Sequence, residues 1–296
     1  MLRAADGRVT VTTDVLVDGV HFRRDWSSGY DVGRRAAAAN LADIAAMGAV
    51  PTGVVVGLAA PGDLPLPWVD DLADGFRDET ELAGAAVVGG DVVISPTLVI
   101  AVTALGDLRG HRPVTRSGAT PGDAVVVAGR LGFAAAGLAL LRAGHGAGTQ
   151  WAELTDAHRR PQVAYDAALR LAELGATSMI DVSDGLVADL AHLARASGVG
   201  IELARDDLPL PAELVDAALE VGADPLSWVA GGGDDHAFAA TLPSDLALRA
   251  VAELAELPEP VPFAQVGRVV SGSGVVFVDG PAPTGEGWDH FRPELP

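Results

Sequence analysis

The sequence contains no cysteine and no lysine, and these two absences exclude several classes of protein. Without cysteine there can be no disulfide, no thiolate metal ligand and no cysteine nucleophile. Walker A loops, Schiff-base enzymes and pyridoxal-phosphate enzymes each need a lysine amine, so they are excluded as well. All 20 basic residues are arginine. A protein of this sequence that handles phosphates must therefore use metal ions, arginine and backbone N–H groups.

Long apolar runs are absent too. No uncharged apolar run reaches the length of about 18 residues that a membrane-spanning helix needs, and the first residues lack the apolar core of a signal peptide. We therefore expect a cytoplasmic protein. The net charge of −20 argues against nucleic acid and anionic membranes as partners. The chain has 296 residues, 49% of them hydrophobic, which suffices for two modest domains or one large one.

Apolar periodicity predicts strands and helices that alternate along the chain, as in a layered α/β or α+β architecture. In the first half we expect strands over 9–17, 54–59 and 97–105 and helices over 31–47 and 67–85. In the second half we expect helices over 131–142, 162–174, 186–194, 211–221 and 244–254, with strands over 124–128, 237–242, 262–270 and 275–278.

The polar segment 109–122 carries two prolines and separates these two halves. Proline and polar residues between periodic segments are typical of a linker. We therefore predict an N-terminal domain over 1–112 and a C-terminal domain over 113–296.

The segment Asp181-Val182-Ser183-Asp184-Gly185 organises the second half, because it follows an apolar run and opens an amphipathic helix. Ser183 is a good N-cap, and a carboxylate beside the first N–H groups of a helix is stabilising. That structural role explains one aspartate about as well as a functional role does. Two aspartates that point into one crevice repel each other unless a cation lies between them.

Further aspartates lie where a structural role explains them poorly. Asp14 lies in a β-rich run on the same face as Thr12, and Asp43 lies within an alanine-rich helix. Asp91 follows a double glycine, which we interpret as a loop that lets backbone approach a ligand, and Asp234 follows a triple glycine. Each alone is more often a turn residue or a solvated carboxylate. Together with Asp181 and Asp184, in a chain without cysteine, they favour a hard cation such as Mg²⁺.

Three other residues are candidates with an equally ordinary alternative. His21 is as well explained by a partly buried surface position as by a ligand role. Arg116 is a solvated loop charge or, beside a metal-carboxylate site, a partner for a triphosphate. Trp288 is a core or rim aromatic or a stacking platform.

Six motifs, in this order, resemble those of the thiamine-monophosphate kinase family and span nearly the whole chain. They are Thr12-Thr13-Asp14 with Gly19-Val20-His21-Phe22, Asn40-Leu41-Ala42-Asp43-Ile44-Ala45-Ala46-Met47-Gly48-Ala49, Gly89-Gly90-Asp91, Thr115-Arg116-Ser117-Gly118, Asp181-Val182-Ser183-Asp184-Gly185 and Trp288-Asp289-His290-Phe291. The resemblance implies an α+β fold of two domains like aminoimidazole ribonucleotide synthetase, with mixed sheets packed against helices and a homodimer formed through the N-terminal domains. It also implies transfer of the ATP γ-phosphoryl group to thiamine monophosphate, by direct in-line attack assisted by several Mg²⁺ ions.

The same resemblance implies roles for individual residues. The magnesium ligands would be Thr12, Thr13, Asp14, Asp43, Asp91, Asp181 and Asp184, of which Asp43, Asp181 and Asp184 are the expected catalytic carboxylates. The nucleotide would contact Gly90, Asp91, Arg116 and Ser183, and thiamine monophosphate would contact His21, Asp234 and Trp288.

Two departures from the family pattern leave alternatives open. The family has a Gly-Asp-Asp motif before its first strand that the printed sequence does not contain, so we expect weaker Mg²⁺ binding by the chain as given. The usual Gly-Gly-Glu-Asp reads Gly232-Gly233-Asp234-Asp235 here, with a side chain one methylene shorter. The alternatives are another ATP-dependent enzyme of the same superfamily and a non-catalytic nucleotide-binding paralogue.

Overall fold

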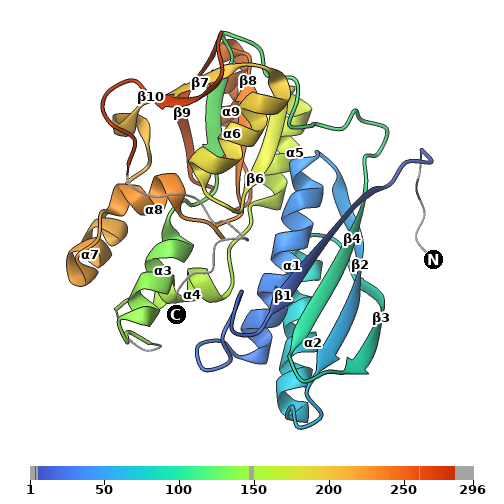
Figure 1. Cartoon of the computed structure of the whole chain (residues 1–296). Helices are drawn as coiled ribbons and strands as arrows, with labels where there is room; N and C mark the ends of the chain where they lie inside the picture. The colour runs from blue at the N-terminus through green and yellow to red at the C-terminus, as the bar shows by residue number, and fades with distance from the viewer. Residues whose placement is uncertain (1–3, 5, 147–149, 260, 284–296) are drawn as a thin grey trace. The chain divides into compact units, whose positions relative to one another are not determined.

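The computed structural model describes residues 4, 6–146, 150–259 and 261–283, and its chain divides into two compact units (Figure 1). Unit 1 consists of Met1–Val114 and Arg159–Glu173, and unit 2 consists of Thr115–His158 and Leu174–Pro296. The expected mixed α+β fold is confirmed. The expected C-terminal domain runs unbroken from residue 113 to residue 296, whereas Arg159–Glu173 belongs to unit 1.

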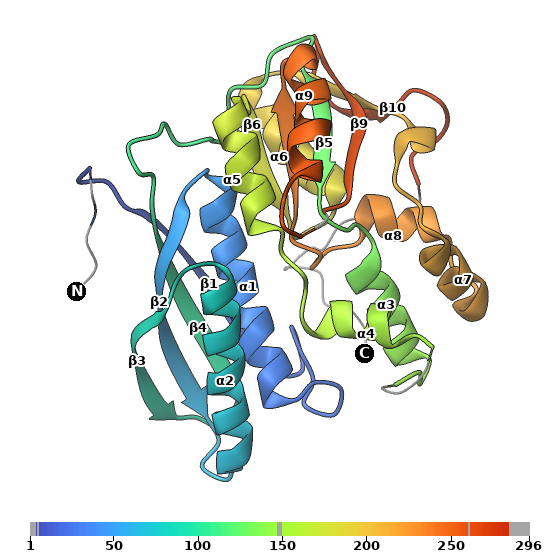
Figure 2. The same cartoon turned by 180° about the vertical axis from the view of Figure 1, so that it is seen from behind.

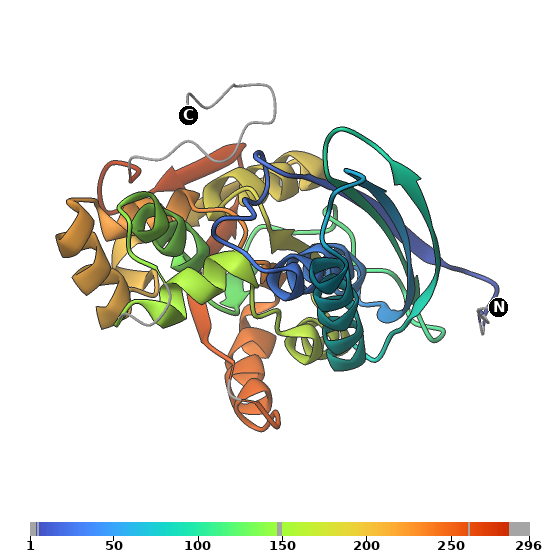
Figure 3. The ribbon, with the colours of Figure 1, turned by 90° about the horizontal axis from the view of Figure 1, so that it is seen from below.

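Unit 1 is a four-stranded sheet with helices on one face. The sheet order is β1-β4-β2-β3, with bounds Thr10–Val17 (β1), Val99–Asp107 (β4), Val50–Ala60 (β2) and Val87–Ile94 (β3). β2 and β3 are parallel, and the other neighbours are antiparallel. Figure 3 shows the helices α1 (Gly29–Ala46) and α2 (Leu66–Leu82) together on one face of this sheet.

Side chains of unit 1 alternate between the helix-covered face and an outer face, as the period of two requires. On β4, Ile100, Val102 and Ala104 are completely buried under the helices. On β1, the outer residues Val11 and Val15 remain 59% and 46% exposed. The sheet therefore has one packed face and one face that presents valine side chains outward.

The two helices of unit 1 pack unusually closely because glycines line their contact. A Cβ atom at Gly33 of α1 would collide with the backbone of Leu72, and one at Gly75 of α2 with the backbone of Tyr30. Helix α1 begins at Gly29, two residues before the start expected from the sequence. Its N-cap is Ser28. Asp31 is the third helical residue, and its carboxylate accepts the backbone N–H of Ser28 in a capping box.

Helix α5 (Tyr165–Leu174) joins unit 1 through a buried carboxylate on α2. The Tyr165 hydroxyl donates to Glu79 Oε1 at 2.7 Å, while the Arg34 guanidinium of α1 donates to Glu79 Oε2. Glu79 is 1% exposed, so this carboxylate is buried with its charge paired. These bonds explain why a segment so distant in sequence belongs to unit 1.

Unit 2 is a six-stranded sheet with helices on both faces. Its order is β10-β7-β9-β5-β8-β6, with bounds Gly274–Phe277 (β10), Gly200–Leu203 (β7), Phe263–Val270 (β9), Ala124–Ala128 (β5), Ala237–Leu242 (β8) and Ser178–Val182 (β6). Its helices are α3 (Phe133–Arg142), α4 (Ala152–Arg159), α6 (Leu186–Ser197), α7 (Ala212–Val221), α8 (Pro225–Gly231) and α9 (Ser244–Ala255), with a short 3₁₀ turn at Arg205–Asp207. Figures 1 and 2, seen from opposite sides, show α6 on one face of the sheet and α9 on the other.

Both faces of the sheet are covered at this end of unit 2, so all five residues of the edge strand β6 and all six of its neighbour β8 are buried. Polar groups that must reach a ligand can lie only at the ends of such strands or in the loops that follow them. Within the described ranges, no helix is long and apolar enough to cross a membrane.

Candidate active site

The unit 1 part of the candidate site lies between β1 and α1. Thr12 Oγ1 donates a 2.6 Å hydrogen bond to Asp43 Oδ2, and the backbone N–H of Asp14 donates to Asn40 Oδ1 at 3.0 Å. Asn40 is completely buried, and its Nδ2 donates to Ala36 O. The strand and helix thus hold Thr12, Asp14 and Asp43 together on the covered face, as the shared face of Thr12 and Asp14 predicts.

Two expected ligands have side chains on the other face of this sheet. Thr13 follows Thr12 and therefore points outward, where its hydroxyl lies 2.8 Å from that of Thr103. Asp91 pairs with Gly57 of β2, on the same outer face, and is exposed. Gly89, Gly90 and Asp91 are part of strand β3, which corrects the expectation of a loop. The side chains of Thr13 and Asp91 are therefore separated by the sheet from those of Asp14 and Asp43.

His21 lies in the turn after β1, and its ring orientation is set by the backbone. The Val17 N–H donates to His21 Nδ1 at 3.0 Å, and the His21 N–H donates to Val17 O. Because Nδ1 accepts a hydrogen bond, its lone pair is in use and the proton of the neutral ring lies on Nε2. The backbone of this turn therefore sets the tautomer of His21, with Nε2–H as the ring donor.

The unit 2 part of the candidate site begins at the end of β6 with Asp181. This carboxylate is 4% exposed, and its Oδ2 lies 3.1 Å from Nδ1 of the equally buried His236. His236 has a left-handed backbone conformation with φ 50°, and its N–H donates to Val182 O. Both the ring and the backbone of His236 are therefore fastened to the strand that carries Asp181.

The loop Ser183–Gly185 after this strand is organised by a carboxylate from inside the next helix. Asp189 Oδ2 accepts the N–H groups of Ser183, Asp184 and Gly185 at 3.1, 3.0 and 3.1 Å. The N-cap of α6 is Gly185, without a side-chain bond, so the expectation that Ser183 caps the helix is wrong. Burial raises the pKa of Asp189 to about 7, with a further contribution from the nearby charge of Asp181.

The glycine-rich loop 231–236 packs directly on this segment. The N–H of Asp234 donates to Ser183 O at 2.9 Å, and a Cβ atom at Gly233 would collide with that same carbonyl oxygen. Asp234 has φ 66°, a conformation that aspartate tolerates better than most residues. The loop after β6, helix α6 through Asp189, and the 231–236 loop thus meet at Ser183.

Asp235 turns inward and serves a structural purpose. Its carboxylate accepts the N–H groups of Gly132 and Ala134 at the start of α3, whose own N-cap is a glycine. Burial raises the pKa of Asp235 to about 7, against the lowering effect of these two N–H groups. Of the two adjacent aspartates, Asp235 caps a helix and Asp234 lies in the loop that contacts Ser183.

Of the expected ligand-binding residues Arg116 and Trp288, the structure describes only Arg116. Arg116 is exposed in the segment after Val114, and its carbonyl oxygen accepts from the Ser197 hydroxyl at the end of α6 at 3.1 Å. That hydroxyl also accepts the Gly118 N–H at 3.1 Å, so the loop is fixed to unit 2 while the guanidinium remains accessible. Trp288 lies outside the described residues.

Among the described residues, no three His, Asp or Glu side chains gather in an arrangement that would hold a metal ion. The donors present are nevertheless of the right chemistry. Within unit 1 they are the Thr12 hydroxyl with the carboxylates of Asp14 and Asp43, and within unit 2 they are Asp181 and Asp184. Carboxylate and hydroxyl oxygens suit a hard divalent cation such as Mg²⁺.

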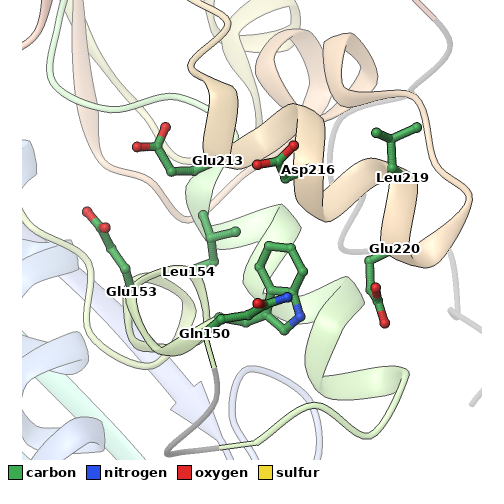
Figure 4. A pocket seen from close by; sticks show the side chains of 8 residues that line it. Gln150, Glu153, Leu154, Glu213, Asp216, Leu219 and Glu220 are labelled. Atoms are coloured by element: carbon green, nitrogen blue, oxygen red, sulfur yellow. The ribbon is translucent and has the colours of Figure 1, made fainter.

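A cavity of about 500 Å³ in unit 2 holds none of these residues. It lies between α4 and α7, and Figure 4 shows carboxylates from both helices around it. Those carboxylates are Glu153, Glu213, Asp216 and Glu220, with the indole of Trp151 beside them. A wall of this charge repels phosphate groups, so the cavity is no candidate for a nucleotide site.

Comparison with known proteins assigns the family. The chain matches AIR synthase related protein, N-terminal domain, over residues 1–108 and AIR synthase related protein, C-terminal domain, over residues 120–280. It is 45% identical to thiamine-monophosphate kinase of Mycobacterium tuberculosis over 98% of this chain and 83% of that protein. The chain belongs to the thiamine-monophosphate kinase family.

Solved structures of this family agree with the fold. The structure of thiamine monophosphate kinase from Aquifex aeolicus has a TM-score of 0.83 at 34% identity, covering 95% of this chain and 90% of that one. A structure described as AaThiL complexed with AMPPCP and TMP has a TM-score of 0.86 at 32% identity, covering 98% and 89%. The resemblance inferred from the six motifs is thereby confirmed.

Three supporting residues carried a weaker signal in the sequence. Asn40 opens the second family motif, but no role followed from that position. Asp189 is an acidic residue four positions after a glycine that cannot cap its own helix, and this spacing was the available clue. His236 follows two aspartates, and its approach to Asp181 depends on pairing between β6 and β8, which no local pattern reveals.

Proposed function

We propose that the protein transfers the γ-phosphoryl group of ATP to the phosphate of thiamine monophosphate, giving thiamine diphosphate and ADP. The observation that carries this proposal is the set of oxygen donors held on β1, α1 and the loop after β6, in a chain without lysine. Phosphoryl transfer needs positioning and charge neutralisation more than covalent chemistry. A relative that is 32% identical over nearly this whole chain is described in complex with AMPPCP and TMP.

Mg²⁺ is part of the proposal. Thr12, Asp14, Asp43, Asp181 and Asp184 would hold the ions, which when bound neutralise the charge of the phosphate groups. The side chains of Thr13 and Asp91 cannot share the unit 1 position with Asp14, because they lie on the opposite face of the sheet. Of Thr13, only the backbone remains available at that position.

The chain's other residues bind and orient the substrates. His21 offers Nε2–H to an oxygen of thiamine monophosphate, and Asp234 lies beside Ser183 to meet the same substrate. The Ser183 hydroxyl and the accessible Arg116 guanidinium would contact the nucleotide, with Gly90 and Asp91 on β3 as further contacts. Trp288 remains assigned to the thiamine phosphate by family resemblance alone.

We further propose direct in-line attack by the substrate phosphate, without a phosphoenzyme. An anionic phosphate oxygen is already a nucleophile and requires no general base of high pKa. ATP made chiral at the γ-phosphorus tests the proposal. A single transfer inverts the configuration at phosphorus, whereas retention would show an enzyme-bound intermediate.

The expected homodimer would form through the outer face of the unit 1 sheet. This face carries the exposed residues Val11, Val15, Val55 and Val93, which lie between 40% and 59% exposed. Contiguous exposed valines on a sheet are typical of a protein interface. Asp91 and Thr13 lie on the same face, so a second copy that covers it would bring its own surface to both.

Sedimentation of the wild type and of Val93→Glu tests this interface. The charged variant should sediment as a monomer, while Val276→Glu on β10 of unit 2, with similar exposure, should leave the dimer intact. A monomeric wild type would contradict the dimer and leave the kinase proposal standing. A cytoplasmic location is also part of the proposal, because the proposed reaction consumes ATP.

Among the alternatives, the nucleotide-binding paralogue predicts ATP binding without turnover. Another ATP-dependent enzyme of the superfamily predicts ADP formation with a different acceptor. Incubation with ATP, Mg²⁺ and thiamine monophosphate, followed by separation of the nucleotides and thiamine phosphates, distinguishes all three. The kinase proposal predicts equal amounts of ADP and thiamine diphosphate.

A further inference from the structure

Asp189 occupies a place where many enzymes bind an anionic ligand. Successive backbone N–H groups in a loop that leads into a helix form a concavity that commonly receives a phosphate. In the loop that leads into α6, the N–H groups of Ser183, Asp184 and Gly185 converge instead on one oxygen, Asp189 Oδ2. Asp189 is 3% exposed, so its carboxylate is enclosed together with the backbone that it binds.

The opposite side of the same loop is held by different residues. Ser183 O accepts the N–H of Asp234, and Val182 O accepts the N–H of His236. Gly233 leaves room for this contact, since any Cβ there would meet Ser183 O. The N–H and the C=O of Ser183 are therefore both bonded within the protein, and neither is available to a ligand.

This arrangement has a consequence for what the loop can bind. Because the N–H groups of Ser183, Asp184 and Gly185 are bonded to a carboxylate, these three amides cannot cradle a phosphate. What Ser183 and Asp184 can present to a ligand is therefore a hydroxyl and a carboxylate. A loop with this chemistry attracts a cation and repels an anion.

We propose that Asp189 is a positioning residue, which holds Ser183–Gly185 in the one conformation that presents Asp184 and Ser183 to the metal-bound nucleotide. The proposal rests on the proposed function for the identity of the ligand. The positioning itself does not depend on that function, because the three hydrogen bonds and the contact with the 231–236 loop are present in the ligand-free chain. Asp189 touches only backbone of the loop and acts through the residues that it orients.

Two substitutions separate positioning from charge. Asp189→Ala removes the acceptor and leaves three N–H groups without a protein partner, so the loop should open. Asp189→Asn keeps an acceptor oxygen of nearly the same position but removes the charge. If position matters, the asparagine variant should stay close to the wild type and the alanine variant should not.

The matched control is Asp123→Asn. Asp123 is also a buried carboxylate of unit 2 that accepts a loop N–H, from Thr120 at 2.9 Å, and a hydroxyl, from Thr177 at 2.7 Å. Thr177 precedes β6, whereas Asp181 and Ser183 lie at the opposite end of that strand. This control should lower the melting temperature without changing divalent-ion binding.

The measurements are Mn²⁺ binding by electron paramagnetic resonance and amide hydrogen exchange of Ser183, Asp184 and Gly185, both without thiamine monophosphate. In Asp189→Ala we expect Mn²⁺ affinity to fall about tenfold and the three amides to exchange faster. In Asp189→Asn we expect affinity within about threefold of the wild type, below the roughly tenfold or greater loss typical when a supporting contact is removed. Restoration by asparagine is a result that a purely electrostatic role would not give.

Several outcomes would overturn the proposal. Unchanged amide exchange and Mn²⁺ affinity in Asp189→Ala would show that the loop holds itself. Equal loss of affinity in both variants, with the amides still protected, would show that only the charge matters. If Asp189→Ala does not fold, Asp189→Asn still decides, since loss of amide protection there contradicts the proposal. A wild type that makes no thiamine diphosphate would refute the kinase function, but the Mn²⁺ affinities and amide exchange rates would still test the role of Asp189.

Discussion

The strands that carry Asp14 and Asp181 present a carboxylate in different ways. β1 has one covered face and one exposed face, so its side chains alternate and Asp14 can remain partly accessible in mid-strand. β6 is inaccessible along its whole length, and Asp181 sits near its end, paired with a buried histidine. A strand covered on one face can carry functional groups within it, whereas a strand covered on both faces must deliver them at its end.

The supports differ in the same way. In unit 1 the site residues are held by side chains of α1, with the Asn40 amide and the Asp43 carboxylate bonded to β1. In unit 2 the loop after β6 is held through its backbone, by Asp189 on one side and the 231–236 loop on the other. We therefore expect substitutions in unit 1 to act locally, and substitutions around Ser183 to displace several functional groups together.

Asp43→Asn should give the largest effect on activity. Asparagine can still accept from Thr12, so the fold should survive, but the loss of charge should lower kcat on the order of a thousandfold. Steady-state kinetics at varied Mg²⁺ concentration and a melting curve check both parts. Asp70→Asn, an exposed aspartate on α2, is the control. Near-normal turnover at limiting Mg²⁺ would show that Asp43 is structural.

Gly233→Ala tests the backbone support in unit 2. The added methyl group must push the 231–236 loop away from Ser183, and a displacement of about 1 Å can cost roughly a hundredfold in kcat/KM. Gly146→Ala adds the same methyl group where no atom lies near, and it should change little. Equal activity of the two variants would mean that contact between the loops is not needed for turnover.

Asn40→Ala should act mainly on stability. It removes the acceptor of the Asp14 N–H from a partly buried hydrogen bond, which costs about 1 kcal/mol of unfolding free energy. Activity should fall only a few-fold, because Asp14 and Asp43 stay on their elements. Urea unfolding together with kinetics measures both quantities. A loss of activity as large as that of Asp43→Asn would contradict the local character assigned to unit 1.

Asp235 predicts a smaller, pH-dependent effect on stability. Since its pKa is raised to about 7 in the native state, the folded protein retains a proton that the unfolded chain has lost above about pH 4. Stability should therefore fall as pH rises between these two values, by up to about 1.4 kcal/mol per pH unit from this group. Asp235→Asn should make the fall shallower in urea unfolding with EDTA at pH 5 and 7. Asp216→Asn should keep the wild-type slope, and an unchanged slope in Asp235→Asn would contradict the assignment.

Local patterns predicted the elements that periodicity and capping control, with errors at their ends. The helix of Asn40 and Asp43 was expected from its apolar face to begin at Asp31. Its first two residues were missed because the N-cap is Ser28, three residues earlier. The period of two placed Thr12 and Asp14 on one face, and the same rule puts Thr13 on the other.

What the sequence could not predict depends on contacts between distant segments. The face on which Asp91 lies follows from the pairing of β3 with β2, and double glycine had suggested a loop instead. The return of Arg159–Glu173 to unit 1 depends on the bond from Tyr165 to Glu79, 86 residues apart in sequence. The spacing of Asp189 after Gly185 was only a weak clue to its role, because its partners are backbone N–H groups, which any sequence offers.

The most direct test of the account is the product balance of the purified protein with ATP, Mg²⁺ and thiamine monophosphate. Phosphorus NMR should show one thiamine diphosphate formed for each ADP, no reaction with EDTA present, and almost none with Asp43→Asn. ADP formed without thiamine diphosphate, or product formed equally well by Asp43→Asn, would contradict the proposed phosphoryl transfer at these carboxylates.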